Sequence, residues 1–219
     1  DKALPVRARR IGVGAQGAIT CAGHFSGNNI NLGGGPLPNA GHDDLFVARL
    51  DSSGAHLWSK SYGTTASENL ATLAVSAAGD VTLTGRPPFI NGGAKRRYSF
   101  LIKRFDNAGA SGWVQHHGNT KAMKGIQVAA DLSGVAVMAS YSSTITFAGQ
   151  TFEPSPSGSR LVVHYDPQGK PLWARKAVFR TISASPQRDG VALVSDEEQP
   201  SPGWGRAARI REPLLTVIG

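Results

Sequence analysis

Histidines and carboxylates are the residues of this chain that could carry acid–base or metal chemistry. The chain has six histidines and 15 acidic residues among its 219 residues. No two histidines have the spacing of a zinc-binding motif such as H-E-x-x-H. His116 and His117 are adjacent after an apolar run, and consecutive side chains of a strand point to opposite faces. The sequence therefore predicts no metal site and no cofactor.

Converging carboxylates would be needed for a glycosidase or lyase. The stretches between the apolar runs offer Asp43, Asp44, Glu68 and Glu153. Asp43 and Asp44 begin an apolar run, where hydrogen bonding at the start of a strand explains them better than calcium binding, which needs more carboxylates. The glycine run at 33–35 opens no helix, so it is no phosphate-binding loop, and no G-x-S-x-G motif is present. We therefore expect no enzyme and no catalytic residues.

Positive charge is the second chemical feature. The net charge is +8 and the sequence pI is near 10.0, which favours acidic partners such as anionic polysaccharide, nucleic acid, a phospholipid surface or an acidic protein. A solvated basic surface without a ligand is the alternative interpretation. The sequence predicts a ligand-binding set of ten residues: Lys95, Arg96, Arg97, Tyr98, His116, His117, Lys121, His24, His42 and Asp43.

A repeat supplies the elements that must position these residues. The segment LDSSGAHLW at 50–58 recurs in modified form at 105–113 and 165–173, so its tryptophans are 55 and 60 residues apart. In the shared D-x-x-G, the aspartate can cap a turn and the glycine accepts positive φ. We therefore expect Asp51, Asp106 and Asp166 to be turn caps, with each tryptophan at the start of the packed part of the next strand.

A second turn repeats in step with the first and carries Gly17, Gly79, Gly134 and, in a weaker copy, Gly190. The order is strand, tight turn, strand, long loop, strand, Asp–Gly turn, strand, which is typical of a propeller blade. The sequence predicts one all-β domain over residues 1–219, a β-propeller of four four-stranded antiparallel blades of about 55 residues each. The blades are expected at about 1–63, 64–118, 119–177 and 178–219, with a degenerate fourth unit.

The first unit carries GGGPL at 33–37, AGHDDLFVARLD at 40–51, and then Gly54 and WSK at 58–60. It resembles the bacterial SBBP-type β-propeller repeat, which is common in large cell-surface proteins, including those of myxobacteria. The second and third units match mainly at the strand–turn–strand core, and the fourth hardly matches. The D-x-x-G-x-x-x-W element is also similar to the repeat of pyrroloquinoline-quinone-type propellers, but no quinone pocket is matched. The resemblance implies an exported, surface-associated propeller without a particular ligand, and members usually carry more than four repeats.

The long loops should emerge together on one face of a propeller, and loops tend to carry function. We therefore expect a non-catalytic module for binding, adhesion or scaffolding, with an acidic polysaccharide or protein as partner. A propeller glycosidase or lyase and a nucleic-acid-binding propeller are the alternatives, the latter disfavoured by few loop aromatics. We predict no membrane span, an extracellular or cell-surface location with the periplasm as the alternative, and compatibility with an oligomer or a longer array. Residues 1–10 do not resemble a signal peptide.

Overall fold

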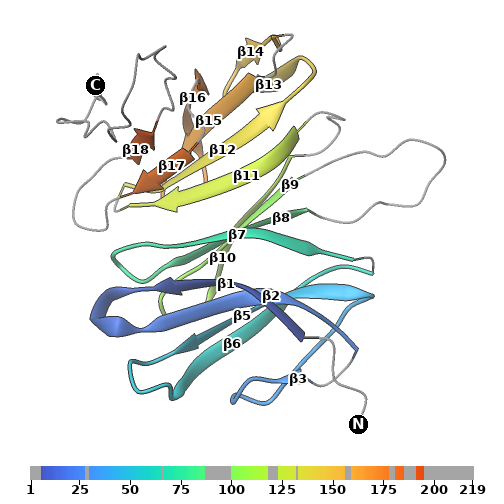
Figure 1. The fold of residues 1–219 in the computed structure, drawn as a ribbon, viewed down its shortest axis with the longest axis vertical. Helices are drawn as coiled ribbons and strands as arrows, with labels where there is room; N and C mark the ends of the chain where they lie inside the picture. Colours follow the sequence, from blue (N-terminus) through green and yellow to red (C-terminus); the bar gives the residue numbers. More distant parts are fainter. Residues whose placement is uncertain are drawn as a thin grey trace, which may run out of the picture.

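The computed structural model describes residues 6–27, 30–65, 67–86, 100–117, 123–131, 133–155, 159–177, 181–184 and 191–194. In these ranges the protein consists of antiparallel β-sheets with one short 3-10 helix at Ala15–Gly17 (Figure 1). The predicted all-β class is confirmed. None of the described residues forms a helix long and apolar enough to cross a membrane.

Three four-stranded sheets carry most of these residues, and each is a meander in chain order. The first sheet contains β1 (Val6–Val13), β2 (Ile19–Ser26), β5 (Asp43–Leu50) and β6 (His56–Tyr62). The second contains β7 (Asn69–Val75), β8 (Val81–Arg86), β9 (Phe100–Phe105) and β10 (Ser111–His117). The third contains β11 (Met123–Ala130), β12 (Val135–Tyr141), β15 (Ser159–Tyr165) and β16 (Pro171–Ala177). The predicted strand order within a unit is therefore observed three times.

Three two-stranded hairpins complete the fold. They are β3 (Ile30–Asn31) with β4 (Pro36–Leu37), β13 (Ile145–Phe147) with β14 (Gln150–Phe152), and β17 (Thr181–Ala184) with β18 (Val191–Val194). The first two lie where the sequence predicted long loops, because the apolar side chains of these stretches add to the hydrophobic clusters of the first and third sheets. Only the β17–β18 hairpin of the predicted fourth unit is among the described residues, and these residues form no closed ring of sheets (Figure 1).

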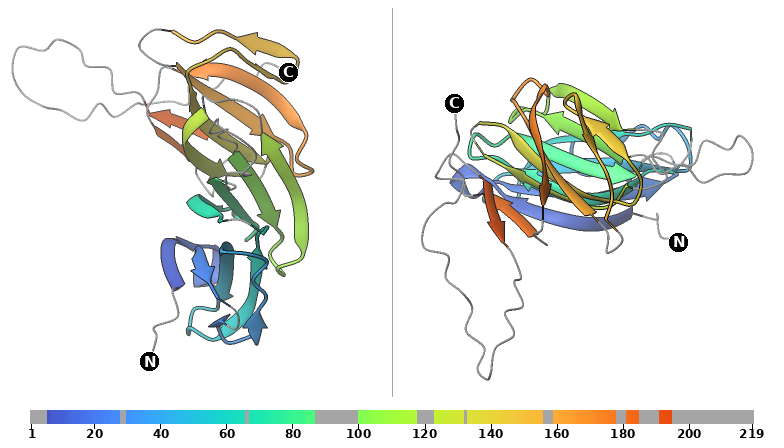
Figure 2. Two further views of the ribbon diagram at one scale, coloured as in Figure 1. Left: turned by 90° about the vertical axis from the view of Figure 1, so that its right-hand side faces the viewer. Right: turned by 90° about the horizontal axis from the view of Figure 1, so that it is seen from above.

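The sheets follow one another along the long axis of the molecule (Figures 1 and 2). Strand β7 packs against β1 and β2, β11 packs against β7 and β8, and β17 packs against β11 and β12. Alternate side chains of each strand point to one neighbouring sheet, as the period of two requires. A hydrophobic cluster joins the first sheet to the second through Ala22, Val47, Trp58, Val81, Leu83 and Phe105.

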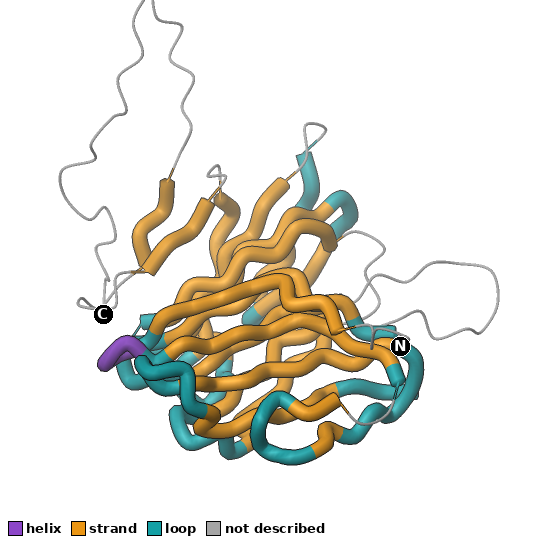
Figure 3. The backbone as a smooth tube through the Cα atoms, turned by 60° about the horizontal axis from the view of Figure 1, so that its bottom comes forward, coloured by secondary structure: helices purple, strands orange, loops and turns teal. Residues whose placement is uncertain are grey.

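The repeat extends to the irregularities of the sheets. The pairing of the first two strands shifts register at the same distance from the turn in the first two sheets, at Ala8/Arg10 and Leu70/Thr72, and one residue pair farther along in the third, at Lys124/Ile126. A bulge of this kind adds a residue to one strand and increases its twist. The bent strands can be followed in the backbone tube (Figure 3).

The Asp–Gly turns lie at one end of the sheets, which we call the turn end. Asp51 Oδ1 accepts hydrogen bonds from the backbone N–H groups of Ser53 and Ala55 at 2.8 and 2.9 Å. Asp106 caps its turn through the same position, with a bond of 2.7 Å from Ala110 N–H, and Asp166 Oδ1 accepts bonds from Gln168 and Lys170 N–H. The prediction that these acids are turn caps is confirmed.

Each of the first two repeat tryptophans reaches across to the turn of the next sheet. Trp58 donates its Nε1–H to the carbonyl oxygen of Asn107 at 2.9 Å. Trp113 donates to the carbonyl oxygen of Pro167 at 3.0 Å. The two acceptors occupy the same position, one residue after the capping aspartate. The sheets are therefore joined by a repeated polar contact as well as by apolar packing.

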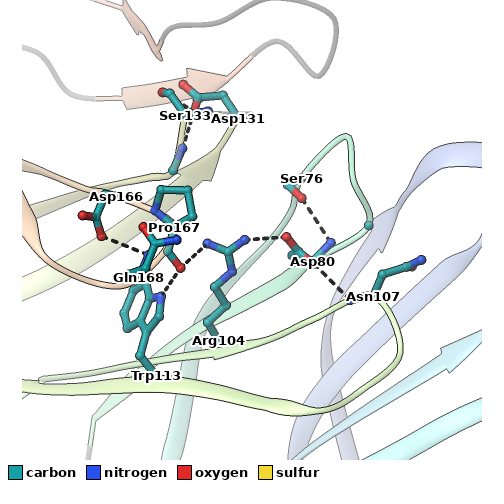
Figure 4. A network of polar contacts seen from close by, with 12 residues as sticks. Ser76, Asp80, Arg104, Asn107, Trp113, Asp131, Ser133, Asp166, Pro167 and Gln168 are labelled. Atoms are coloured by element: carbon teal, nitrogen blue, oxygen red, sulfur yellow. Dashed lines mark hydrogen bonds and ion pairs between the residues drawn. The ribbon is translucent and has the colours of Figure 1, made fainter.

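Arg104 strengthens the second of these junctions (Figure 4). Its Nη2 forms an ion pair with Asp80, and its Nη1 donates to the carbonyl oxygen of Pro167 at 3.0 Å. Asp80 Oδ1 also accepts the backbone N–H of Asn107 at 3.0 Å. Because both side chains are partly buried, solvent screens this network less than it would an exposed pair. The carboxylate of Asp80 is thus part of the scaffold.

Candidate functional site

The end of the sheets opposite the turns is called the loop end, and the first sheet presents a mixed polar group there. Strands β2 and β6 finish at this end, and β1 and β5 begin there, because neighbouring strands of a meander run in opposite directions. The register places Arg7 opposite His24 and Ser26 opposite Asp43. Two of the predicted binding residues, His24 and Asp43, are thus brought to the same end of one sheet.

Three arginines on β1 dominate the charge of this end. Arg7, Arg9 and Arg10 are all exposed on a strand that pairs only with β2. The register shift between Ala8 and Arg10 makes Arg9 the extra residue of a bulge. No carboxylate of the described residues forms an ion pair with any of the three arginines. They were not in the predicted set, although three arginines within four residues were a usable signal.

His24 lies close enough to these arginines for their positive charges to change its pKa. Its side chain is buried, and its Nδ1 has no hydrogen-bond partner among the described residues. Burial lowers the pKa of His24, and the positive charges of Arg9 and Arg7 lower it further, while Asp43 opposes them. The imidazole is therefore held in its neutral form near pH 7. A polar nitrogen and a set of guanidinium groups share this end of the sheet.

The remaining predicted residues of this region lie beside that group. His42 is exposed and Asp43 is half-buried at the start of β5. The carbonyl oxygen of Asp43 accepts the backbone N–H of Glu68 at 2.6 Å, so the segment after β6 is held against the start of β5. This contact brings a second carboxylate, that of Glu68, into the first sheet.

A buried carboxyl pair, Asp44 and Glu68, lies behind the exposed charges. Each side chain is 1 % exposed. Asp44 Oδ2 accepts the Ala40 N–H at 2.6 Å, and Glu68 Oε1 accepts the Thr64 hydroxyl at 2.6 Å. The second oxygens, Asp44 Oδ1 and Glu68 Oε2, receive no donor from the described residues. A proton on one carboxyl lets it donate to the other, which satisfies both groups.

The pKa values of the two carboxyls shift in the direction expected for a pair that shares one proton. Burial raises the pKa of Glu68, and the negative charge of Asp44 and the hydrogen bond between the two side chains raise it further. Burial also raises the pKa of Asp44. The two carboxyls of a glycosidase are held about 5–9.5 Å apart so that a sugar or water fits between them. A hydrogen-bonded pair leaves no such space, so its geometry suits a structural contact better than glycoside hydrolysis.

His116 and His117 are adjacent residues of the second sheet. Their rings contact the two opposite neighbouring sheets, as expected for consecutive residues of a strand. His116 Nε2 lies 3.2 Å from the Tyr62 hydroxyl of the first sheet. His117 Nε2 lies 2.8 Å from the Tyr165 hydroxyl of the third sheet, and its ring packs on Phe147 with centroids 4.5 Å apart. Burial, followed by the charge of His116, lowers the pKa of His117 to about 4. His117 is therefore a neutral inter-sheet contact, whereas His116 stays exposed.

The other five predicted binding residues, Lys95, Arg96, Arg97, Tyr98 and Lys121, lie outside the described residues. No group of three or more metal-ligating side chains is present in the part of the chain that the structure describes. The described loop end therefore offers guanidinium groups, a neutral imidazole and exposed histidines. No known family model and no curated protein sequence matches the chain.

Proposed function

We propose that the chain is a non-catalytic, propeller-type module that binds an acidic polysaccharide or an acidic protein at an extracellular or cell-surface location. The observation that carries the proposal is the exposed set Arg7, Arg9 and Arg10 on β1, with which no carboxylate of the described residues forms an ion pair. Guanidinium groups match the planar geometry of carboxylates and sulfates and stay charged at all physiological pH values.

The order of strands supports the propeller part of the proposal. Three successive meander sheets pack through their first strands, which is the arrangement of neighbouring blades around an axis. In this interpretation the blades cover about 1–63, 64–118 and 119–177, and 178–219 supplies a fourth. The resemblance of the first unit to SBBP-type repeats supports the surface location.

The placement of the basic strand supports binding of a polymer. Residues of a strand follow one another at about 3.4 Å, so the three arginines lie within four consecutive positions of one exposed strand, with Arg9 at the bulge. Long-range attraction between such a strand and a polyanion accelerates their association and weakens with salt.

A charge-reversal experiment tests the proposal. The variant Arg7→Glu, Arg9→Glu and Arg10→Glu should elute from a heparin column at much lower salt than the parent. A matched control, Lys170→Glu, Arg175→Glu and Lys176→Glu, changes the net charge equally at three exposed residues of the third unit. Both variants should keep the circular dichroism and unfolding midpoint of the parent, because all six side chains are exposed.

The outcomes separate the competing functions. Equal losses in the two variants would mean that net charge alone drives retention, and would refute a site on β1. The variant Lys95→Glu, Arg96→Glu and Arg97→Glu tests the predicted residues outside the described part in the same assay. Stronger retention of the parent on duplex DNA than on heparin, with a steep dependence on salt, would instead favour the nucleic-acid alternative.

A further inference from the structure

The contact between neighbouring sheets has a defined receptor, which we call the tryptophan seat. In the second sheet it consists of Phe105, the Asn107 carbonyl and Gly109. Trp58 packs on Phe105 with ring centroids 6.1 Å apart and donates to Asn107. A Cβ added to Gly109 would lie 2.6 Å from Cδ2 of Trp58, so the indole rests directly on this glycine.

The third sheet repeats the seat with different side chains. Trp113 packs on Tyr165 with ring centroids 5.9 Å apart and donates to the Pro167 carbonyl. A Cβ at Gly169 would lie 2.5 Å from Cδ2 of Trp113. Aromatic ring, carbonyl and glycine thus occur at the same three positions in both sheets, and the register of the strands fixes them.

The first sheet has the same three positions, but no indole of the described residues occupies them. They are Leu50, the Ser52 carbonyl and Gly54. Gly54 has φ of 87°, close to the 80° of Gly109, yet a Cβ placed there meets nothing within 4 Å. Leu50 is half-buried, whereas Phe105 at the equivalent position is 3 % exposed. The turn is built in the same conformation, and no side chain of the described residues fills its seat.

The part of this face that β1 and β2 form is also less buried in the described structure than its counterparts. Cys21, Leu83 and Val137 occupy equivalent central positions of β2, β8 and β12, as their pairing partners show. Leu83 and Val137 are 1 % and 2 % exposed, whereas Cys21 is only half-buried. Next to Cys21 in the register, Ile11 is 71 % exposed, although its counterpart Val128 in β11 is 9 % exposed. The outer face of the first sheet, away from the second, therefore repeats the inter-sheet surface: its part around Ile11 and Cys21 is exposed in the described structure, whereas the β3–β4 hairpin covers Phe25 and Phe46.

We infer that this outer face is an interaction surface for a further four-stranded sheet of the same repeat, whose fourth strand inserts a tryptophan into the seat of Leu50, Ser52 and Gly54. The basis is continuity with an interface that the molecule forms twice. The inference goes beyond binding at the basic strand, because it concerns assembly of the repeat. The face suits this occupant because it presents a turn glycine in position for an indole, a feature that a generic apolar partner would not use.

The single cysteine of the chain provides the probe, since Cys21 lies within the face. A second copy of residues 64–117, which contains Trp113 and no cysteine, is placed directly before Asp1. Five residues then separate the copied His117 from Val6, as five separate His117 from Met123 in the natural chain. Maleimide labelling of Cys21 is measured in the natural and the extended chain.

We expect labelling of Cys21 to slow on the order of tenfold or more in the extended chain, because a covered thiol reacts only when the interface opens. Replacing Trp113 by Ala in the added copy alone should restore much of the rate. As a second measurement, Gly54→Ala should lower the unfolding midpoint more in the extended chain than in the natural one. Equal labelling rates in the two chains would overturn the inference, as would an added copy that fails to fold.

Two further outcomes identify other occupants and would also overturn the inference. Protection of Cys21 in the natural chain that grows with protein concentration would assign the face to a second copy of this chain. Protection that is independent of concentration would show that the chain already covers the face itself. Failure of the heparin experiment on β1 would leave all of these measurements unchanged.

Discussion

The indole of Trp58 lies on the backbone of Gly109, 51 residues later in the chain and in the neighbouring sheet. The contact requires a residue without Cβ, because a methyl group there would overlap the six-membered ring. The same glycine also has positive φ. One residue therefore satisfies the local turn and the packing between sheets, and the two requirements can be separated experimentally.

The first prediction compares Gly109→Ala with Gly54→Ala. Both place alanine at positive φ, which costs about 1–2 kcal/mol. Only Gly109→Ala also displaces an indole, so we expect it to lower the free energy of unfolding by about 1–3 kcal/mol more than Gly54→Ala does. Urea denaturation of the two variants measures the difference. Equal costs would show that the tryptophan does not rest on the turn in solution.

The second prediction concerns the tryptophan itself. Trp113→Ala removes the stacking on Tyr165 and the hydrogen bond to Pro167, and should destabilise the protein by about 3–5 kcal/mol. Leu172→Ala is the control, because Leu172 is an apolar residue of a fourth strand that is 53 % exposed, and it should cost no more than about 0.5 kcal/mol. A Trp113→Ala variant as stable as the parent would contradict the blade model.

The third prediction concerns the Asp44–Glu68 pair and rising pH. Burial raises the pKa of Glu68 above its ordinary value. Its contribution to stability is therefore complete below the pKa of the unfolded chain and is lost as the pH rises through the folded pKa. Glu68→Gln keeps a donor toward Asp44 and has no proton to lose. It should be more stable than the parent at pH 8 by about 1 kcal/mol, because one buried charge is removed.

Calorimetric unfolding between pH 4 and pH 9 measures this effect. The stability of the parent should decline as the pH rises above the ordinary pKa of glutamate, about 4.3, and Glu68→Gln should flatten the decline. Glu153→Gln serves as the control, because Glu153 is exposed and its carboxylate accepts a hydrogen bond from the Thr144 hydroxyl. A Glu68→Gln variant that loses stability at every pH would rule out the shared proton.

The fourth prediction concerns His117 and acidic pH. Its pKa of about 4 lies below the usual value for histidine, so protons bind more readily to the unfolded chain. The contribution of this residue to the free energy of unfolding is present above about pH 6.5 and is lost as the pH falls through 4. The loss between pH 7 and pH 4 is about 3 kcal/mol. In His117→Gln, the change in the free energy of unfolding between pH 7 and pH 4 should be smaller by that amount. His116→Gln, at the exposed neighbour, should reduce the dependence only in part, because burial is the larger cause of the lowered pKa of His117 and the charge of His116 the smaller one.

The repeat explains why so much of the scaffold was predictable. A turn cap depends on residues that are close in sequence, so Asp51 and Gly54 reveal their roles within four positions. The same turn recurs with Asp106 and Asp166, and its spacing sets the order of strands that the structure shows three times. The predicted set of four blades goes further than the described residues, which form three sheets and the β17–β18 hairpin.

The sequence by itself determined the all-β class, the order of strands in a unit and the scaffold role of the repeated Asp, Gly and Trp residues. These features follow from local backbone preferences and from the spacing of the repeat along the chain. Only the tertiary structure decided which residues meet across sheets and loops. Glu68 lies 24 positions from Asp44, and His117 meets Tyr165 across 48 positions. Contacts of this kind depend on how the sheets stack, so no local pattern specifies that one carboxyl shares a proton, one histidine stays neutral and one glycine seat is left unfilled by the described residues.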